Sequence, residues 1–261
     1  MKPLLIASTF APSDLNTHWY KLQKQFIEKT TYIEYDYKII LNGTDSTDFL
    51  ANDVLEINKN NKGHAYALEQ LLDYFRNSPY ESYLILDSDC FPVWNGWHHV
   101  LSEQMRKFNK TIAAPVRTEN LDIFPHPSAF FMLEKGINDP SLDFNPSKSV
   151  NLLGSKIMEV GGAMHSMTEQ LLPLMRTNVS NPHPIAAAIY HHLFYHHGAG
   201  SRDFNFRILK RYDYYRHWFD QSEREKQCCQ LLDALVKNPD KFINHLMYGN
   251  KRKFLPKWLS F

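Results

Sequence analysis

Short apolar runs alternate with amphipathic segments over the first 115 residues of this 261-residue chain. Apolar runs with no alternating polar face are typical of buried parallel strands, whereas apolar residues that recur every three or four positions indicate helices. Strands that alternate with helices over short links predict an α/β fold, with a mostly parallel sheet and helices on both faces. The predicted strands are 4–8, 35–41, 54–57, 83–86 and 112–115, and the predicted helices open at Ser13, follow Gly63 and cover 95–108.

The second half of the chain is less regular. Residues 117–150 are rich in proline and have few periodic stretches, which favours long loops over a site rather than a second compact domain. Strands are predicted at 128–133 and 189–195, and helices at 164–175 and 222–236. The pattern therefore predicts one domain with a variable C-terminal half.

Composition and charge narrow the classes of function. Lys and Arg (29) nearly balance Asp and Glu (28), which argues against a protein that binds nucleic acid through its overall field. Three cysteines are too few for a disulfide framework and indicate a reducing compartment. No apolar run has the length of a signal-peptide core or a transmembrane segment. We therefore expect a soluble, cytoplasmic protein without a transmembrane segment or a nucleic-acid partner.

The segment Asp87-Ser88-Asp89 is the first candidate for chemistry. It follows an apolar strand, at the end where open α/β sheets place their ligands. Two carboxylates on a turn can share a hard divalent cation, which in turn neutralises a diphosphate. The alternative is a turn that only caps the next helix.

Three further segments carry candidate residues. The loop before Ala65 contains Gly63, which lets backbone approach a ligand at a helix N-terminus that favours negative charge. The pair His196-His197 ends a predicted strand, whose alternation allows only one of the two rings to reach a site. Glu169 lies in the predicted helix after a Gly-Gly pair. For Gly63 the alternative is an ordinary loop–helix junction, and for the two histidines it is a pair of half-buried rings. For Glu169 the alternative is a first-turn charge that is favourable to the helix dipole.

Taken in chain order, these segments resemble the GT-A-fold, nucleotide-sugar-dependent glycosyltransferases, of the family 2 type. Residues 4–10 look like the first nucleotide-binding strand, and Asn42 stands in the turn after strand two where many members have Asp. Residues 61–67 resemble the Asn-x-Gly-x-x-x-Ala helix start, and residues 83–89 the strand followed by the DXD motif. The segment 160–170 resembles the Gly-Gly and Glu-Asp region of inverting members, with Gln170 in place of Asp.

The resemblance implies a GT-A (Rossmann-like) domain over 1–215, with a nucleotide-binding half (1–115) and an acceptor half (116–215). A helical extension, 216–261, follows it. The implied activity is a metal-dependent, hexosyltransferase-like transfer of a sugar from a nucleotide-diphosphate sugar, with inversion expected and retention as the alternative. Mn²⁺ or Mg²⁺ is the implied ion, and the acceptor is a glycan, a lipid-linked sugar or a small molecule. A metal-dependent hydrolase and a non-catalytic nucleotide- or sugar-binding module remain the alternatives.

The same resemblance implies roles for single residues. Glu169 is the expected base and Arg202 the expected clamp on the leaving diphosphate. The metal ligands are expected to be Asp87, Asp89 and His197, with the choice between His197 and His196 left open. The expected contacts to the nucleotide sugar are Thr9, Phe10, Asn42, Asn61, Gly63, Asp87 and Ser88.

Overall fold

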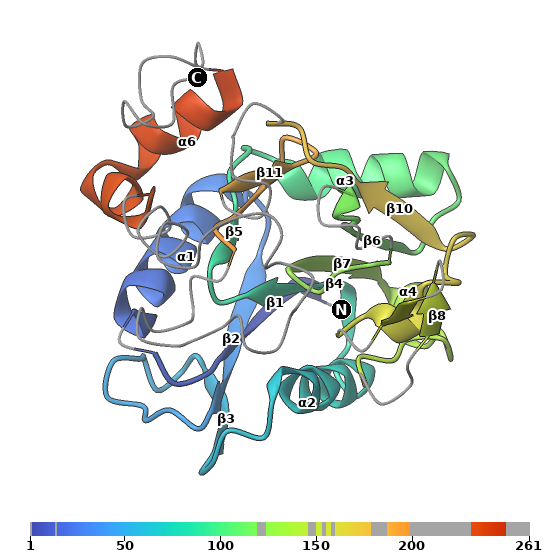
Figure 1. The fold of residues 1–261 in the computed structure, drawn as a ribbon, viewed down its shortest axis with the longest axis horizontal. Helices are drawn as coiled ribbons and strands as arrows, with labels where there is room; N and C mark the ends of the chain where they lie inside the picture. Colours follow the sequence, from blue (N-terminus) through green and yellow to red (C-terminus); the bar gives the residue numbers. More distant parts are fainter. Residues whose placement is uncertain are drawn as a thin grey trace.

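A seven-stranded sheet forms the centre of the computed structural model, with strand order β10-β6-β7-β4-β1-β2-β3 (Figure 1). The strands are β1 (Lys2–Phe10), β2 (Tyr35–Asn42), β3 (Val54–Asn58), β4 (Tyr80–Asp87), β6 (Ile112–Pro115), β7 (Ala129–Leu133) and β10 (Leu171–Leu174). The structure describes residues 2–13, 15–118, 124–145, 150–152, 155–157, 160–178, 187–198 and 231–248.

Most neighbouring strands in this sheet are parallel. β1 pairs in parallel with both β2 and β4, β2 with β3, and β6 with β10, whereas β7 runs antiparallel to β4 and β6. The carboxyl ends of β1 to β4 therefore meet at one edge of the sheet. This edge carries Thr9, Asn42, Asn58 and Asp87, and the mostly parallel architecture confirms the predicted fold class.

Helices cover both faces of the sheet, as the sequence predicted (Figure 1). On β1, Leu4 and Ile6 belong to one apolar core and Leu5 and Ala7 to the other, because successive strand residues point to opposite faces. The first core includes side chains of α1 (Asn16–Thr30), α3 (Trp97–Lys107) and α6 (Pro239–Tyr248), and the second those of α2 (His64–Arg76) and α4 (Glu134–Ile137).

A second, three-stranded sheet lies beside the end of β4. It consists of β5 (Cys90–Pro92), β12 (Phe194–His196) and β11 (Ala188–Tyr190), all antiparallel. The prediction of one strand over 189–195 is wrong, because a turn at 191–193 divides this segment into a hairpin. A separate short hairpin pairs β8 (Val150–Leu152) with β9 (Ser155–Ile157).

The helix predicted over 164–175 is also wrong. The structure has a single 3₁₀ turn, η2 (Gly162–Met164), and then strand β10 at the sheet edge. Pro173 explains the difference, since proline disrupts a helix interior but is tolerated on an edge strand.

The predicted C-terminal helix, 222–236, is observed over the part that the structure describes. Residues 231–237 are helical and α6 follows them, while residues 222–230 lie outside the described ranges. None of the helices in the described part of the chain combines the length and the apolar character that crossing a membrane requires.

The turn of the β11–β12 hairpin is strained. Leu193 N–H donates to the Tyr190 carbonyl (2.8 Å), and the two central residues, His191 and His192, have φ of 53° and 58°. Positive φ at both positions is typical of type I′ turns, which favour Asn and Gly because other residues clash there. Strain is thus built into the hairpin that carries His196.

We expect His192→Gly to stabilise the protein by about 0.5–1 kcal/mol, because glycine adopts this backbone without a steric penalty. His192 is exposed, so its side chain contributes little packing. Urea unfolding checks the result. His99→Gly in α3, at a residue with ordinary helical backbone, should shift stability in the opposite direction. A destabilised His192→Gly variant would contradict the assignment of strain to this turn.

Candidate metal centre

Asp87 and Asp89 lie on a tight turn between β4 and β5, at the carboxyl edge of the main sheet. Asp87 is the last residue of β4, and its N–H donates to the Ser128 carbonyl (3.1 Å) at the start of β7. Ser88 and Asp89 are buried. The apolar β4, buried on both faces, fixes where this turn begins, so that both carboxylates are placed by the core beneath them.

Gln23 of α1 holds the backbone of this turn in place by hydrogen bonds. Its amide Nε2 donates to the carbonyls of Asp87 (2.9 Å) and Cys90 (2.7 Å), and the Tyr37 hydroxyl donates to its Oε1 (2.5 Å). Gln23 is completely buried. The sequence signal for this residue is a polar position within the apolar stripe of the helix predicted to open at Ser13.

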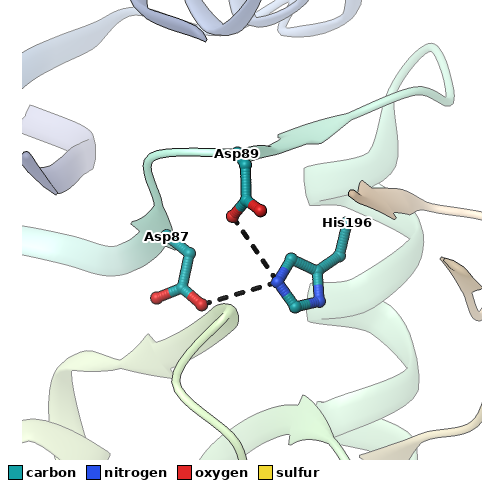
Figure 2. A group of neighbouring side chains, drawn as sticks. All are labelled: Asp87, Asp89 and His196. Atoms are coloured by element: carbon teal, nitrogen blue, oxygen red, sulfur yellow. Dashed lines mark ion pairs between the residues drawn. The ribbon is translucent and has the colours of Figure 1, made fainter. Parts of the chain in front are cut away.

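His196 reaches the two carboxylates from β12. Its Nε2 lies 3.6 Å from Asp87 Oδ2 and 3.5 Å from Asp89 Oδ1 (Figure 2). The ladder with β5 pairs His196 with Cys90, so the last residue of the hairpin lies beside the turn. All three side chains are buried or nearly so, with exposed fractions of 5% for His196 and Asp89 and 15% for Asp87.

His197 is directed away from this cluster. Its Nδ1 is 2.7 Å from the Tyr195 hydroxyl, and its ring packs on Trp19 with a centroid separation of 4.9 Å. Its backbone contacts the turn, where its N–H donates to the Asp89 carbonyl (3.0 Å). Of the two histidines left open by the sequence, the structure therefore brings His196 to the carboxylates and packs the side chain of His197 in the core.

The cluster fits a divalent cation. One ligand atom from each of Asp87, Asp89 and His196 lies within 4.8 Å of the others. Metal–ligand bonds of about 2.0–2.4 Å place neighbouring ligand atoms about 3–4 Å apart, which matches the observed separations of 3.5 and 3.6 Å. Two carboxylates and one imidazole suit an ion such as Mn²⁺.

Burial shifts the pKa values of two neighbouring groups in the direction that favours their uncharged forms. Burial, followed by the nearby charge of Arg117, holds the pKa of His126 well below its usual range, and the Ser128 N–H donates to its Nδ1 (3.2 Å). The His126 ring lies 5.9 Å from that of His196. Burial, followed by the charges of Asp87 and Asp89, holds the pKa of the Cys90 thiol well above its usual range.

Asn42 holds the loop that leads into α2. Its Nδ2 donates to Asn61 Oδ1 (3.1 Å) and to the Gly63 carbonyl (3.0 Å), and its Oδ1 accepts from the Lys62 N–H (3.1 Å). Asn42 is buried, whereas Asn61 and Gly63 are exposed. The structure thus joins these three residues in one hydrogen-bond network, in which the Asn42 side chain holds the loop in place.

Thr9 and Phe10 end β1 next to the turn, and Thr9 pairs with Asp87 in the sheet. The Phe10 ring packs in the core against Tyr20 and Phe49. Thr9 is therefore the residue of this pair that lies closest in register to Asp87.

Glu169 is not brought to this site. It is exposed, lies two residues before the start of β10, and its carbonyl accepts from Lys110 Nζ (2.7 Å). β10 is parallel to β6, which runs in the same direction as β4 because both are antiparallel to β7. Glu169 thus lies at the amino edge of the sheet, opposite Asp87. Arg202 lies outside the residues that the structure describes.

Comparison with known proteins gives structural likenesses only. No protein-family model and no curated protein matches the chain. The mannosyltransferase of Pyrobaculum calidifontis, solved with GDP-Man and Mn²⁺, is 12% identical over 52% of this chain and 46% of its own (TM-score 0.39). S. aureus TarS (residues 1–349) is 14% identical over 69% of this chain and 61% of its own (TM-score 0.45).

A third solved structure covers more of both chains. It is a "putative nucleotide-diphospho-sugar transferase" from Desulfovibrio desulfuricans G20, 8% identical over 91% of this chain and 98% of its own (TM-score 0.45). By contrast, this chain spans less than two thirds of the length of the mannosyltransferase and of the TarS fragment. Because all three TM-scores are below 0.5, the function proposed below rests on the geometry of the site.

Proposed function

We propose that this protein is a metal-dependent glycosyltransferase, which moves a sugar from a nucleotide-diphosphate sugar to the hydroxyl of an acceptor. The observation that carries the proposal is the Asp87–Asp89–His196 cluster at the carboxyl edge of a mostly parallel sheet. Ligands of open α/β sheets bind at this edge. The motif resemblance of residues 4–89 to GT-A enzymes supports the same function.

Each residue of the cluster has a defined part in this proposal. Asp87, Asp89 and His196 would hold a divalent cation, for which Mn²⁺ fits the imidazole ligand better than Mg²⁺ does. When bound, the ion neutralises charge that develops on the departing diphosphate as the bond from the sugar anomeric carbon to phosphate oxygen breaks. The buried Gln23 keeps the turn in place while this charge changes.

The neighbouring strand ends would receive the nucleotide. Thr9 lies beside Asp87 in the ladder, and Asn42 keeps Asn61 and Gly63 at the start of α2, where exposed N–H groups favour a phosphate. Glu169 has no part in this proposal, since it lies at the opposite edge of the sheet. The acceptor oxygen would bond to the anomeric carbon as the bond from that carbon to the diphosphate breaks, and the hydroxyl proton would be released to water.

Calorimetric titration with UDP and with GDP, each in the presence of Mn²⁺ or EDTA, tests the proposal. We expect one nucleotide to bind at least about tenfold more tightly with Mn²⁺, because a cation held by this cluster would neutralise negative charge on the diphosphate. Equal affinity in EDTA would contradict a metal-dependent donor site. Binding of Mn²⁺ that leaves nucleotide affinity unchanged would instead favour a hydrolase. Transfer or hydrolysis of the matching nucleotide sugar then separates an enzyme from a binding module.

A further inference from the structure

We propose that His64 is a positioning residue for Asp87, an inference that rests on the proposed metal site. His64 is the first residue of α2, and its Nε2 lies 3.2 Å from Asp87 Oδ1. The other carboxylate oxygen, Oδ2, faces His196 Nε2 at 3.6 Å. The Asp87 carboxylate therefore lies between two imidazoles that come from different parts of the chain, one on each of its oxygens.

The Asp87 Oδ1 atom lacks a hydrogen-bond donor within the part of the chain that the structure describes. The atom is buried, and none of the described residues directs a hydrogen-bond donor at it. A buried carboxylate oxygen without a donor is unfavourable. His64 Nε2 is already at donor distance, and 38% of the His64 side chain is exposed, so its ring has room to rotate and direct an N–H at Oδ1. That contact fixes the rotation of the carboxylate and aims Oδ2 at the ion.

The backbone that carries His64 is held independently. The Gly63 carbonyl accepts from Asn42 Nδ2 (3.0 Å), and the Gly63 N–H donates to Asn61 Oδ1 (2.9 Å). Gly63 has φ of 91°, a conformation that glycine adopts without strain. The network around Asn42 thus places the first residue of α2 next to Asp87, which connects the sequence motif at 61–67 to the metal centre through His64.

Residues that hydrogen-bond to metal ligands typically contribute about 10–100-fold to metal affinity. We therefore expect His64→Ala to weaken the binding of Mn²⁺ alone, without nucleotide, by about tenfold or more. His64→Gln keeps an N–H donor at a similar distance from the backbone and should restore affinity to within about threefold of the original. Calorimetry or the electron paramagnetic resonance signal of free Mn²⁺ measures both.

His99→Ala is the matched control. His99 lies in the first turn of α3 and has Nε2 3.3 Å from Glu103 Oε1, but both side chains are largely exposed and belong to a surface ion pair. This variant should bind Mn²⁺ like the unmodified protein. Thermal unfolding in EDTA is measured for all variants, because a purely structural role of His64 would shift the unfolding temperature without the selective loss and rescue of Mn²⁺ affinity.

The outcomes separate this inference from the function on which it rests. If the unmodified protein binds Mn²⁺ and His64→Ala binds it equally well, the role of His64 is overturned while the proposed metal site stands. The role is also overturned if His64→Gln is as weak as His64→Ala. If the unmodified protein binds no Mn²⁺, both proposals fail.

Discussion

Replacement of Asp89 by Asn is expected to abolish the Mn²⁺-dependent part of nucleotide binding, because Asp89 is one of the three proposed metal ligands. The amide keeps the shape of the side chain but removes a negative charge that faces the ion. Because Asp89 is only 5% exposed, water cannot readily replace the lost ligand. We expect Mn²⁺ affinity to fall by at least about 100-fold. This loss equals or exceeds the largest losses typical of residues that hydrogen-bond to a metal ligand without contacting the metal.

The metal-free protein should keep its fold in this variant. Asp89 lies close to Asp87 around one imidazole, and neutralising one of two neighbouring carboxylates relieves their repulsion. Thermal unfolding in EDTA therefore accompanies the calorimetric titration. Asp73→Asn on α2, where the carboxylate is 74% exposed, is the control and should bind Mn²⁺ normally. Undiminished metal-dependent nucleotide affinity in Asp89→Asn would remove Asp89 from the site.

The two neighbouring histidines should respond to alanine substitution in opposite ways. We expect His196→Ala to lower Mn²⁺ affinity by about 10–100-fold, because its Nε2 faces both carboxylates. We expect His197→Ala to lower the free energy of unfolding by about 2–4 kcal/mol, since it loses the Trp19 contact and leaves a cavity in the core. The folded His197→Ala variant should still bind Mn²⁺ with nearly the original affinity.

Urea unfolding and Mn²⁺ titration of both variants, at a temperature where each is folded, check this contrast. The two substituted residues are adjacent in the chain, so each variant serves as the control for the other. If His197→Ala lost the metal while His196→Ala kept it, the ring orientations described here would be contradicted. The ligand first expected from the sequence would then be restored.

The parallel core of the fold was predictable from the sequence because its strands are short, apolar and buried on both faces. Residues 83–86 show this pattern directly before Asp87, so the position of the acidic turn at the carboxyl edge followed from the strand alone. Side-chain alternation also predicted that only one of His196 and His197 would reach the site. It could not choose between them without the register of β12 against β5.

The hairpin and the last strand were less predictable, for reasons that lie in particular residues. His191 and His192 occupy positive-φ positions that sequence patterns assign to Asn and Gly, so the turn between β11 and β12 went unseen. Pro173 is incompatible with the interior of the helix predicted over 164–175, since proline disrupts helix interiors. With that helix replaced by β10, Glu169 lies at the sheet edge away from the acidic turn.

Two contacts of the site were not predictable from the sequence because they join residues that are far apart in the chain. Gln23 and Asp87 are 64 residues apart, and His64 and Asp87 meet only because α2 begins at the same sheet edge where β4 ends. Neither contact can be identified from the residues next to it in the sequence, because the partners are far apart along the chain. The polar Gln23 on an apolar helix stripe was the one available sign, because a buried amide must find hydrogen-bond partners.

Anomalous diffraction at the manganese edge, from crystals soaked with Mn²⁺ and the nucleotide that binds, tests the metal centre most directly. We expect one manganese peak at about 2.0–2.4 Å from carboxylate oxygens of Asp87 and Asp89 and from His196 Nε2, with diphosphate oxygens on its open side. A nucleotide bound at this edge with no manganese between it and the two carboxylates, or a manganese peak elsewhere in the molecule, would contradict the proposed function.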